Sequence, residues 1–108
     1  MNWNTRATQL LGCKYPIIQG AFGGFGTSAI AAPVSAAGGF GIITGSALRT
    51  PEKLRDDIRK ARSMTDAPFG VNFSIGMCPN VEALRDAAIE ERVPVIFTSA
   101  FRADEHGR

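Results

Sequence analysis

Two features of this chain have the chemistry and the position to hold a small ligand. Residues 19–28, QGAFGGFGTS, are rich in glycine, so their main-chain amides are exposed without obstruction from side chains. Asn72 follows the apolar residues 69–71, and its carboxamide carries both donors and an acceptor. One interpretation of Asn72 is therefore that it faces a heteroaromatic ligand.

The second interpretation of Asn72 is a core asparagine bonded to neighbouring backbone, because buried polar groups are usually satisfied internally. Thr98 and Ser99 offer small hydroxyls further along the chain, and a turn at a strand end explains them equally well. Cys78 has no cationic neighbour in the sequence and is interpreted as an inert thiol. The residues alone leave the role of Asn72 open.

Part of the glycine-rich run formally matches a dinucleotide-binding fingerprint. GFGTSA, residues 24–29, fits the pattern GxGxxG/A. That fingerprint also needs a tight turn after the strand and an acidic residue about twenty positions later, for the ribose. The first glycine here comes four residues after Gly20, and the first acidic residue of the chain is Glu52. We expect a ligand-facing loop of another α/β fold.

The other reactive residue types exclude several classes of site. His106 is the single histidine and has no HExxH spacing, so no metal site is expected. Cys13 and Cys78 form no CxxC pair, which favours reduced thiols and a cytoplasmic location. The formal net charge of +2 is too small to indicate nucleic-acid binding. No apolar stretch reaches the roughly 20 residues of a membrane span.

Four short apolar segments predict the strands that would position these residues. They are rich in Ile, Val and Phe and do not alternate with polar residues, which is typical of strands buried on both faces of a parallel sheet. The predicted strands are residues 16–19, 40–44, 69–75 and 94–98.

Helices are predicted between the strands. Thr50 followed by Pro51 is typical of a helix start, and the charged residues 55–60 are expected to face solvent. Asn80 is the predicted N-cap of a second amphipathic helix that ends near residues 91–92.

Two further helices are less regular in sequence. Residues 28–37 predict a helix of small residues, which Pro33 should cause to start late or to bend. Residues 5–11 predict a short leading helix. The alternation of strands and helices predicts a parallel α/β fold, and such folds bind ligands at the carboxyl ends of their strands.

Three stretches together resemble the N-terminal part of the nitronate monooxygenase family, formerly the 2-nitropropane dioxygenase family. They are also similar, nearly as closely, to the flavin-dependent enoyl-acyl-carrier-protein reductase, which shares the same barrel. The stretches are LLGCKYPIIQGAFGG (10–24), VSAAGGFGIITGSALRTPEKLRDDIRKARSMTDAPFGVN (34–72) and EERVPVIFTSA (90–100).

The resemblance implies a (β/α)₈ barrel that binds FMN at the carboxyl ends of its strands. It implies that Asn72 hydrogen-bonds the cofactor and that the loop after the first strand lies along the flavin ring. The residues of that loop are Gln19, Gly20, Ala21, Phe22 and Gly23. Family members usually have Met where Phe22 stands. The catalytic histidine and phosphate-binding glycines of the family belong to the second half of the barrel, so no catalytic residue is assigned in this chain.

Residues 1–108 are therefore expected to form a single partial domain, the N-terminal half of the barrel with four parallel strands. Because an open sheet exposes its edges, the chain should self-associate or pair with the missing half-barrel. By itself it should be inactive.

The expected activity of the complete enzyme is the oxidation of a small-molecule substrate, an alkyl nitronate, with molecular oxygen. Residues 73–80, FSIGMCPN, are expected to form an apolar wall that suits a small anion. The alternatives are enoyl-thioester reduction, or a non-catalytic half-barrel that binds a phosphorylated ligand or a partner chain.

Overall fold

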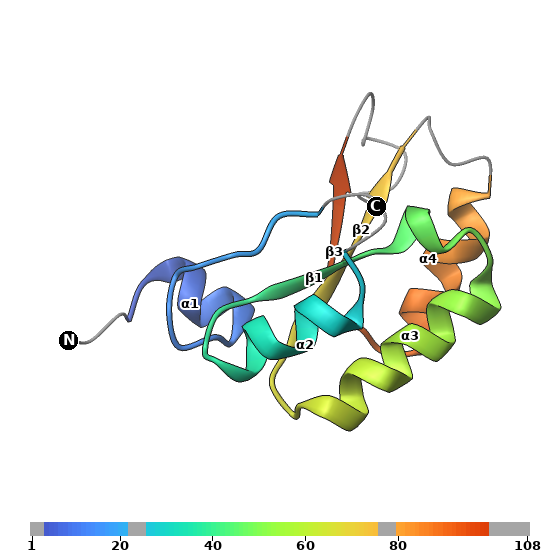
Figure 1. The fold of residues 1–108 in the computed structure, drawn as a ribbon. Helices are drawn as coiled ribbons and strands as arrows, with labels where there is room; N and C mark the ends of the chain where they lie inside the picture. Colours follow the sequence, from blue (N-terminus) through green and yellow to red (C-terminus); the bar gives the residue numbers. More distant parts are fainter. Residues whose placement is uncertain (1–3, 22–25, 76–79, 100–108) are drawn as a thin grey trace.

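The computed structural model describes residues 4–21, 26–75 and 80–99. These residues form an α/β fold in which parallel strands alternate with helices (Figure 1). The strands lie side by side in chain order and are β1 (Gly41–Thr44), β2 (Phe69–Ser74) and β3 (Val95–Ser99). The predicted fold class is confirmed, and three of the predicted strands are present with bounds that differ only at their ends.

The first predicted strand, residues 16–19, is not a strand. It makes one isolated parallel bridge, between Ile18 and Phe40. On its amino-terminal side, Pro16 has no N–H to donate to a neighbouring strand. On the other side, the side chain of Gln19 replaces the main chain as the partner of β1. The sheet of the described residues therefore has three strands where the sequence predicted four.

Helix α3 (Pro51–Met64) connects β1 to β2 and confirms the predicted start. The Thr50 hydroxyl accepts a hydrogen bond from the Lys53 N–H at 3.2 Å, and Pro51 occupies the first turn, where an N–H is not needed. The buried side chains of the helix lie on one stripe facing the sheet; they are Leu54, Ile58 and Ala61. Burial of each large side chain in this stripe contributes about 1.5–3 kcal/mol.

Helix α2 (Ser28–Ala36) differs from the prediction at Pro33. Of the two expected effects of Pro33, the late start is wrong, because the helix begins at Ser28 and continues through Pro33; the bend stays a prediction. Proline has no N–H for the Ala29 carbonyl one turn earlier. Ala29 and Pro33 are both exposed, so water can solvate that carbonyl and the helix tolerates the proline.

Helix α4 (Val81–Glu90) connects β2 to β3, and the side chain of its predicted N-cap residue does not cap it. Asn80 is the N-cap residue by position, but its side chain makes no capping hydrogen bond. Its amide instead donates to the Arg49 carbonyl at 2.6 Å, just after the short 3₁₀ helix η1 (Gly45–Leu48). Arg49 has a φ of 70°, which is uncommon for a residue with a side chain. Asn80 thus ties together the loops that follow β1 and β2.

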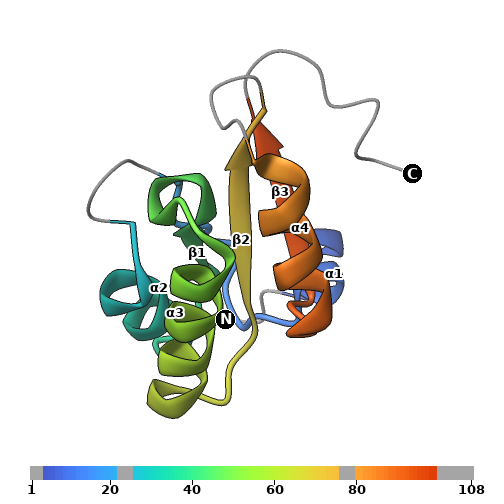
Figure 2. The same cartoon turned by 90° about the vertical axis from the view of Figure 1, so that its right-hand side faces the viewer.

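The two faces of the sheet are covered by different helices. Helices α2, α3 and α4 pack in chain order along one face (Figure 2), against inward side chains such as Ile43 and Val71. Helix α1 (Arg6–Leu11), which confirms the predicted leading helix, lies on the other face, where Leu11 packs with Phe40 and Ile42. The second face is the one that a closed barrel would turn inward.

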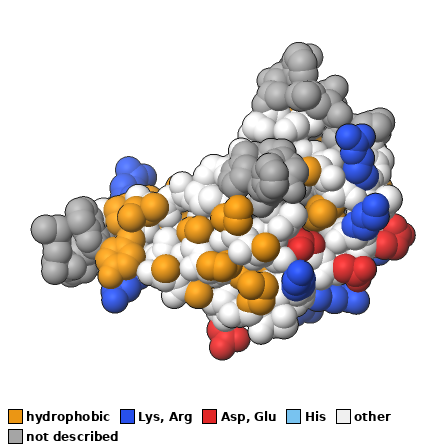
Figure 3. Space-filling model, viewed as in Figure 1, with side chains coloured by type: hydrophobic (Ala, Val, Ile, Leu, Met, Phe, Trp, Pro, Cys, Tyr) orange, Lys and Arg blue, Asp and Glu red, His pale blue; other side chains and the backbone are white. Residues whose placement is uncertain are grey.

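The outer surface of the helices is polar. Figure 3 shows charged side chains gathered over α3 and α4. The prediction that residues 55–60 only face solvent is incomplete, because Arg55 pairs with Glu90, and Arg59 pairs with Glu91 at 2.7 Å. Exposed pairs of this kind contribute about 0–1 kcal/mol each. Among the described residues, no helix is long and apolar enough to cross a membrane.

Candidate functional site

The sheet face opposite the helices changes from apolar to polar along the strands. Side chains alternate between the two faces of a strand, so every second residue of β1, β2 and β3 belongs to this face. Toward the amino ends these residues are Phe40, Ile42, Gly70 and Val95; toward the carboxyl ends they are Thr44, Asn72, Ser74 and Ser99, with Phe97 level with Asn72. The carboxyl edge is where the fold class binds ligands, and here it is lined with small polar groups.

Two aromatic rings form an apolar floor below this polar edge. The ring centroids of Phe40 and Phe97 lie 6.0 Å apart with the rings tilted by 58°. They meet over Gly70 of β2, where a Cβ atom would lie 2.8 Å from Cε2 of Phe97 and 3.0 Å from Cε1 of Phe40. Glycine at this position is therefore required by the packing of the two rings.

Asn72 lies on β2 at the border between the apolar floor and the polar edge. Its residue is only 6% exposed. Nδ2 lies 3.4 Å from the Phe97 carbonyl oxygen and 3.3 Å from Ser99 Oγ, and Oδ1 lies 3.4 Å from the same Oγ. All three distances exceed the usual 2.7–3.2 Å, so the carboxamide is buried yet only weakly held by β3.

Serine hydroxyls continue the polar edge beyond Asn72. Ser99 Oγ lies 3.4 Å from Ser74 Oγ, and the Ser74 N–H donates to Ser46 Oγ at 3.4 Å. The sequence analysis did not assign Thr44 to the site, and it included Ser74 only as part of an apolar wall expected over residues 73–80. The alternation of side chains along β1 and β2 is the signal that would have found them.

Gln19 holds the segment before the glycine-rich run against β1. Its Oε1 accepts a hydrogen bond from the Ile42 N–H at 3.1 Å, and its Nε2 donates to the Ile42 carbonyl at 3.1 Å. Nε2 also donates to the Gly20 carbonyl at 2.8 Å. Ile42 pairs in register with Gly70, so Gln19 is held beside the apolar floor, two residues before the level of Asn72.

Gly20 and Ala21 present their main chain to open space. Both residues are exposed, and a Cβ atom at Gly20 would meet nothing within 4 Å. Their N–H groups make no hydrogen bond within the described residues. Unlike Gly70, Gly20 is not required by packing within the described part of the chain, which suits a position that a ligand approaches closely.

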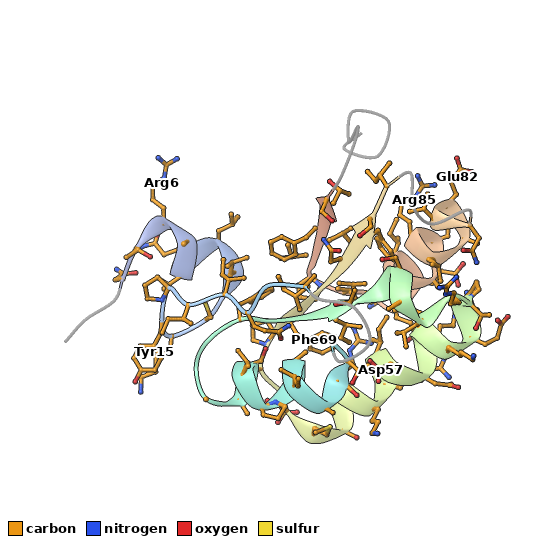
Figure 4. The ribbon with its side chains drawn as sticks, turned by 45° about the horizontal axis from the view of Figure 1, so that its top comes forward. Arg6, Tyr15, Asp57, Phe69, Glu82 and Arg85 are labelled. Carbon is orange, nitrogen blue, oxygen red and sulfur yellow. The ribbon has the colours of Figure 1, made fainter. Side chains whose placement is uncertain are left out.

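The end of the glycine-rich run is fixed at two points. The Gly26 carbonyl accepts a hydrogen bond from the Thr44 N–H at 2.6 Å. Two residues later, Ser28 donates to the carboxylate of Asp57 on α3 with its N–H at 2.9 Å and its hydroxyl at 2.6 Å. Figure 4 shows Asp57 reaching toward the start of α2. The sequence analysis missed this role because it assigned Asp57 to a solvent-facing surface.

Several predicted residues are not brought into the site. Phe73 is 1% exposed and packs among the residues that face the helices, so it does not form the expected apolar wall of the site. Phe22, Gly23, Cys78 and His106 lie outside the described residues.

The chain is similar in sequence to nitronate monooxygenases. The family model described as nitronate monooxygenase matches residues 4–96. A nitronate monooxygenase of Pseudomonas aeruginosa is 54% identical over 70 residues, which are 63% of this chain and 19% of that protein. A probable nitronate monooxygenase of Staphylococcus haemolyticus is 41% identical over 75 residues, 69% of this chain and 21% of that protein. The chain thus spans about a fifth of the length of these curated relatives.

Two solved structures have the same arrangement of elements. FabK from Thermotoga maritima superposes with a TM-score of 0.91 and 42% identity, over 97% of this chain and 33% of that chain. The nitroalkane oxidase from Streptomyces ansochromogenes superposes with a TM-score of 0.70 and 22% identity, over 87% of this chain and 36% of that chain, which shows a shared fold alone. The chain therefore has the fold of part of a (β/α)₈ barrel, as the sequence predicted.

Proposed function

Because the chain belongs to the nitronate monooxygenase family, we propose that the whole protein is a flavin-dependent oxidoreductase that holds FMN at the carboxyl edge of the sheet. The observation that carries the proposal is Asn72, which is 6% exposed and whose side-chain hydrogen bonds within the described residues are all 3.3–3.4 Å long. A polar side chain that is buried but weakly bonded can exchange those contacts for a shorter bond to a ligand.

The described residues fit a planar, polar cofactor. Asn72 offers a donor and an acceptor from the sheet, and the main-chain N–H groups of Gly20 and Ala21 offer donors from the loop. The rings of Phe40 and Phe97 close the space below with an apolar floor. In our proposal Phe22 and Gly23 continue the loop along the same ligand. FMN would supply two-electron redox chemistry at this edge.

We further propose that the substrate is a small alkyl nitronate, oxidised with molecular oxygen. The names of the curated relatives support this choice. In this chain, the hydroxyls of Thr44, Ser74 and Ser99 would orient the reactants by hydrogen bonding. The rings of Phe40 and Phe97 would exclude water from below. A catalytic base would come from outside the described residues.

Reduction of an enoyl thioester is the second candidate. This activity is the one implied by the sequence resemblance to the flavin-dependent enoyl-acyl-carrier-protein reductase. It is favoured by the 42% identity to FabK, which is not named as a nitronate monooxygenase. Anaerobic stopped-flow absorbance of the whole protein separates the two activities. We expect rapid flavin bleaching by an alkyl nitronate and little by NADH or NADPH. Bleaching by a nicotinamide, with none by the nitronate, would contradict nitronate oxidation.

We also propose that the exposed edge of β3 pairs with further barrel strands or with a second chain, in a cytoplasmic protein. Residues Thr98 and Ser99 at the end of β3 are exposed, and β3 is the last strand of the described sheet. Unpaired strand edges favour association. Analytical ultracentrifugation of the 108-residue chain tests the pairing with a second chain, which a monomer near 11.5 kDa would contradict.

A further inference from the structure

Gln19 replaces one peptide group of the sheet by its side chain. The bridge between Ile18 and Phe40 is the start of a parallel ladder, in which the Gln19 N–H donates to the Phe40 carbonyl at 3.0 Å. In a regular ladder the next bonds would join Ile42 to the main chain, namely to the Gln19 carbonyl and the Ala21 N–H. Instead, both bonds of Ile42 go to the carboxamide of Gln19, each at 3.1 Å.

This substitution releases the main chain that follows. A carboxamide has the donor and acceptor of a peptide group, so Ile42 keeps both of its hydrogen bonds. The N–H of Ala21 is no longer needed by β1 and makes no hydrogen bond within the described residues. Gly20, beside it, borders open space. The chain therefore leaves the sheet at Gln19 without leaving Ile42 unpaired.

We propose that Gln19 is a positioning residue, whose carboxamide pairs with Ile42 so that the N–H groups of Gly20 and Ala21 are presented to the ligand. The identity of that ligand as a flavin rests on the function proposed above. Gln19 itself is a poor donor to a ligand, because both hydrogens of Nε2 already have acceptors, the carbonyl oxygens of Gly20 and Ile42.

Pairing with both main-chain groups of Ile42 requires a side chain with the length, the donor and the acceptor of glutamine. Asparagine is one methylene shorter, which shortens its reach toward the neighbouring strand. Glutamate keeps an acceptor for the Ile42 N–H but has no donor for the two carbonyl oxygens and would repel them at neutral pH. Methionine has a similar length and lacks both the donor and the acceptor strength of the amide. These differences allow the positioning role to be separated from simple packing.

The test compares Gln19→Met and Gln19→Glu with Gln9→Met in the whole protein. Gln9 is a matched control because it is an exposed glutamine on α1 whose side chain, within the described residues, bonds only to Asn4, at 2.9 Å. Two quantities are measured: amide hydrogen exchange of Ile42 in flavin-free protein, and the Kd for FMN by fluorescence titration.

Gln19→Met should speed exchange at Ile42 about fivefold or more, because one hydrogen bond to that amide is lost. It should weaken FMN binding by a similar factor, because the N–H groups of Gly20 and Ala21 are then no longer held in position. Gln19→Glu should restore the protection of Ile42, since an oxygen again faces its N–H, but not the affinity for FMN. Gln9→Met should change neither quantity.

Unchanged exchange at Ile42 in Gln19→Met would overturn the proposal. Faster exchange with an unchanged Kd would also overturn it, because the contact would then have no consequence for the ligand. If the unaltered protein binds no flavin, the proposed function is wrong, and the exchange at Ile42 still decides whether Gln19 holds this main chain.

Discussion

The carboxylate of Asp57 binds the first residue of another helix, Ser28, through both its N–H and its hydroxyl, at 2.9 and 2.6 Å. Ser28 is 1% exposed, so its N–H and hydroxyl, the donors of both hydrogen bonds, are shielded from water. A carboxylate at this place also interacts favourably with the positive end of the α2 dipole. Since Ser28 is the last residue of the glycine-rich run, Asp57 connects the stability of the helix layer to the candidate site.

Asp57→Ala should destabilise the protein by about 1–3 kcal/mol, because it leaves a buried N–H and hydroxyl of Ser28 without their acceptor. The midpoint of urea unfolding measures this change. Asp56→Ala is the matched control, since Asp56 is an exposed aspartate at the next position of the same helix. Equal effects of the two substitutions would show that the bond to Ser28 contributes nothing.

Gly70→Ala should destabilise the protein by about 1–3 kcal/mol through overpacking. The added Cβ would lie 2.8 Å from Cε2 of Phe97 and 3.0 Å from both Cε1 of Phe40 and the Val95 carbonyl oxygen. The rings can move only by opening the apolar floor, and the carbonyl belongs to β3. Thermal unfolding followed by circular dichroism tests the prediction, which an unchanged Tm would contradict.

Gly20→Ala should have the opposite pattern, unchanged stability with weaker flavin binding. A Cβ at Gly20 meets nothing within 4 Å, and its φ lies outside the left-handed region, so alanine adds no strain. The methyl group would instead occupy the space that we propose for the ligand. Urea unfolding of the flavin-free protein and FMN titration are the two measurements. Retained affinity for FMN would argue against close approach of the cofactor at Gly20.

The strands and helices were predictable because local patterns determined them. Thr50 and Pro51 mark the start of α3, and the apolar runs mark β1 to β3. The strand predicted for residues 16–19 was wrong because apolar composition does not show whether the main chain or the side chain of Gln19 bonds to β1. The late start predicted for α2 was wrong because the cost of Pro33 depends on the solvent exposure of Ala29, which is a property of the tertiary structure.

The candidate site was predictable in place but not in detail. That Gly20 and Asn72 share one edge follows from the rule for parallel sheets. The link between Asp57 and Ser28 spans 29 positions and depends on how α2 packs against α3, and no local pattern encodes such a contact. Phe73 was assigned to the wrong face because a strand buried on both faces lacks the polar alternation that distinguishes them.

Asn72→Ala is expected to weaken FMN binding several-fold or more in the whole protein, because a hydrogen bond of this kind contributes about 0.5–1.5 kcal/mol net. The loss of stability should be smaller than for a well-bonded core asparagine, since all contacts of Asn72 within the described residues are 3.3–3.4 Å long. FMN titration and urea unfolding of the flavin-free protein measure the two effects separately.

A matched control for Asn72 is Ser99→Ala, which removes the hydroxyl that Asn72 contacts on β3 but leaves the carboxamide itself. If Asn72 binds the cofactor directly, Asn72→Ala should weaken FMN binding more than Ser99→Ala, which keeps the carboxamide. If Asn72 only joins β2 to β3, both variants should unfold at lower urea concentration and neither should change the Kd. An unchanged Kd in Asn72→Ala would therefore return Asn72 to the role of a core residue.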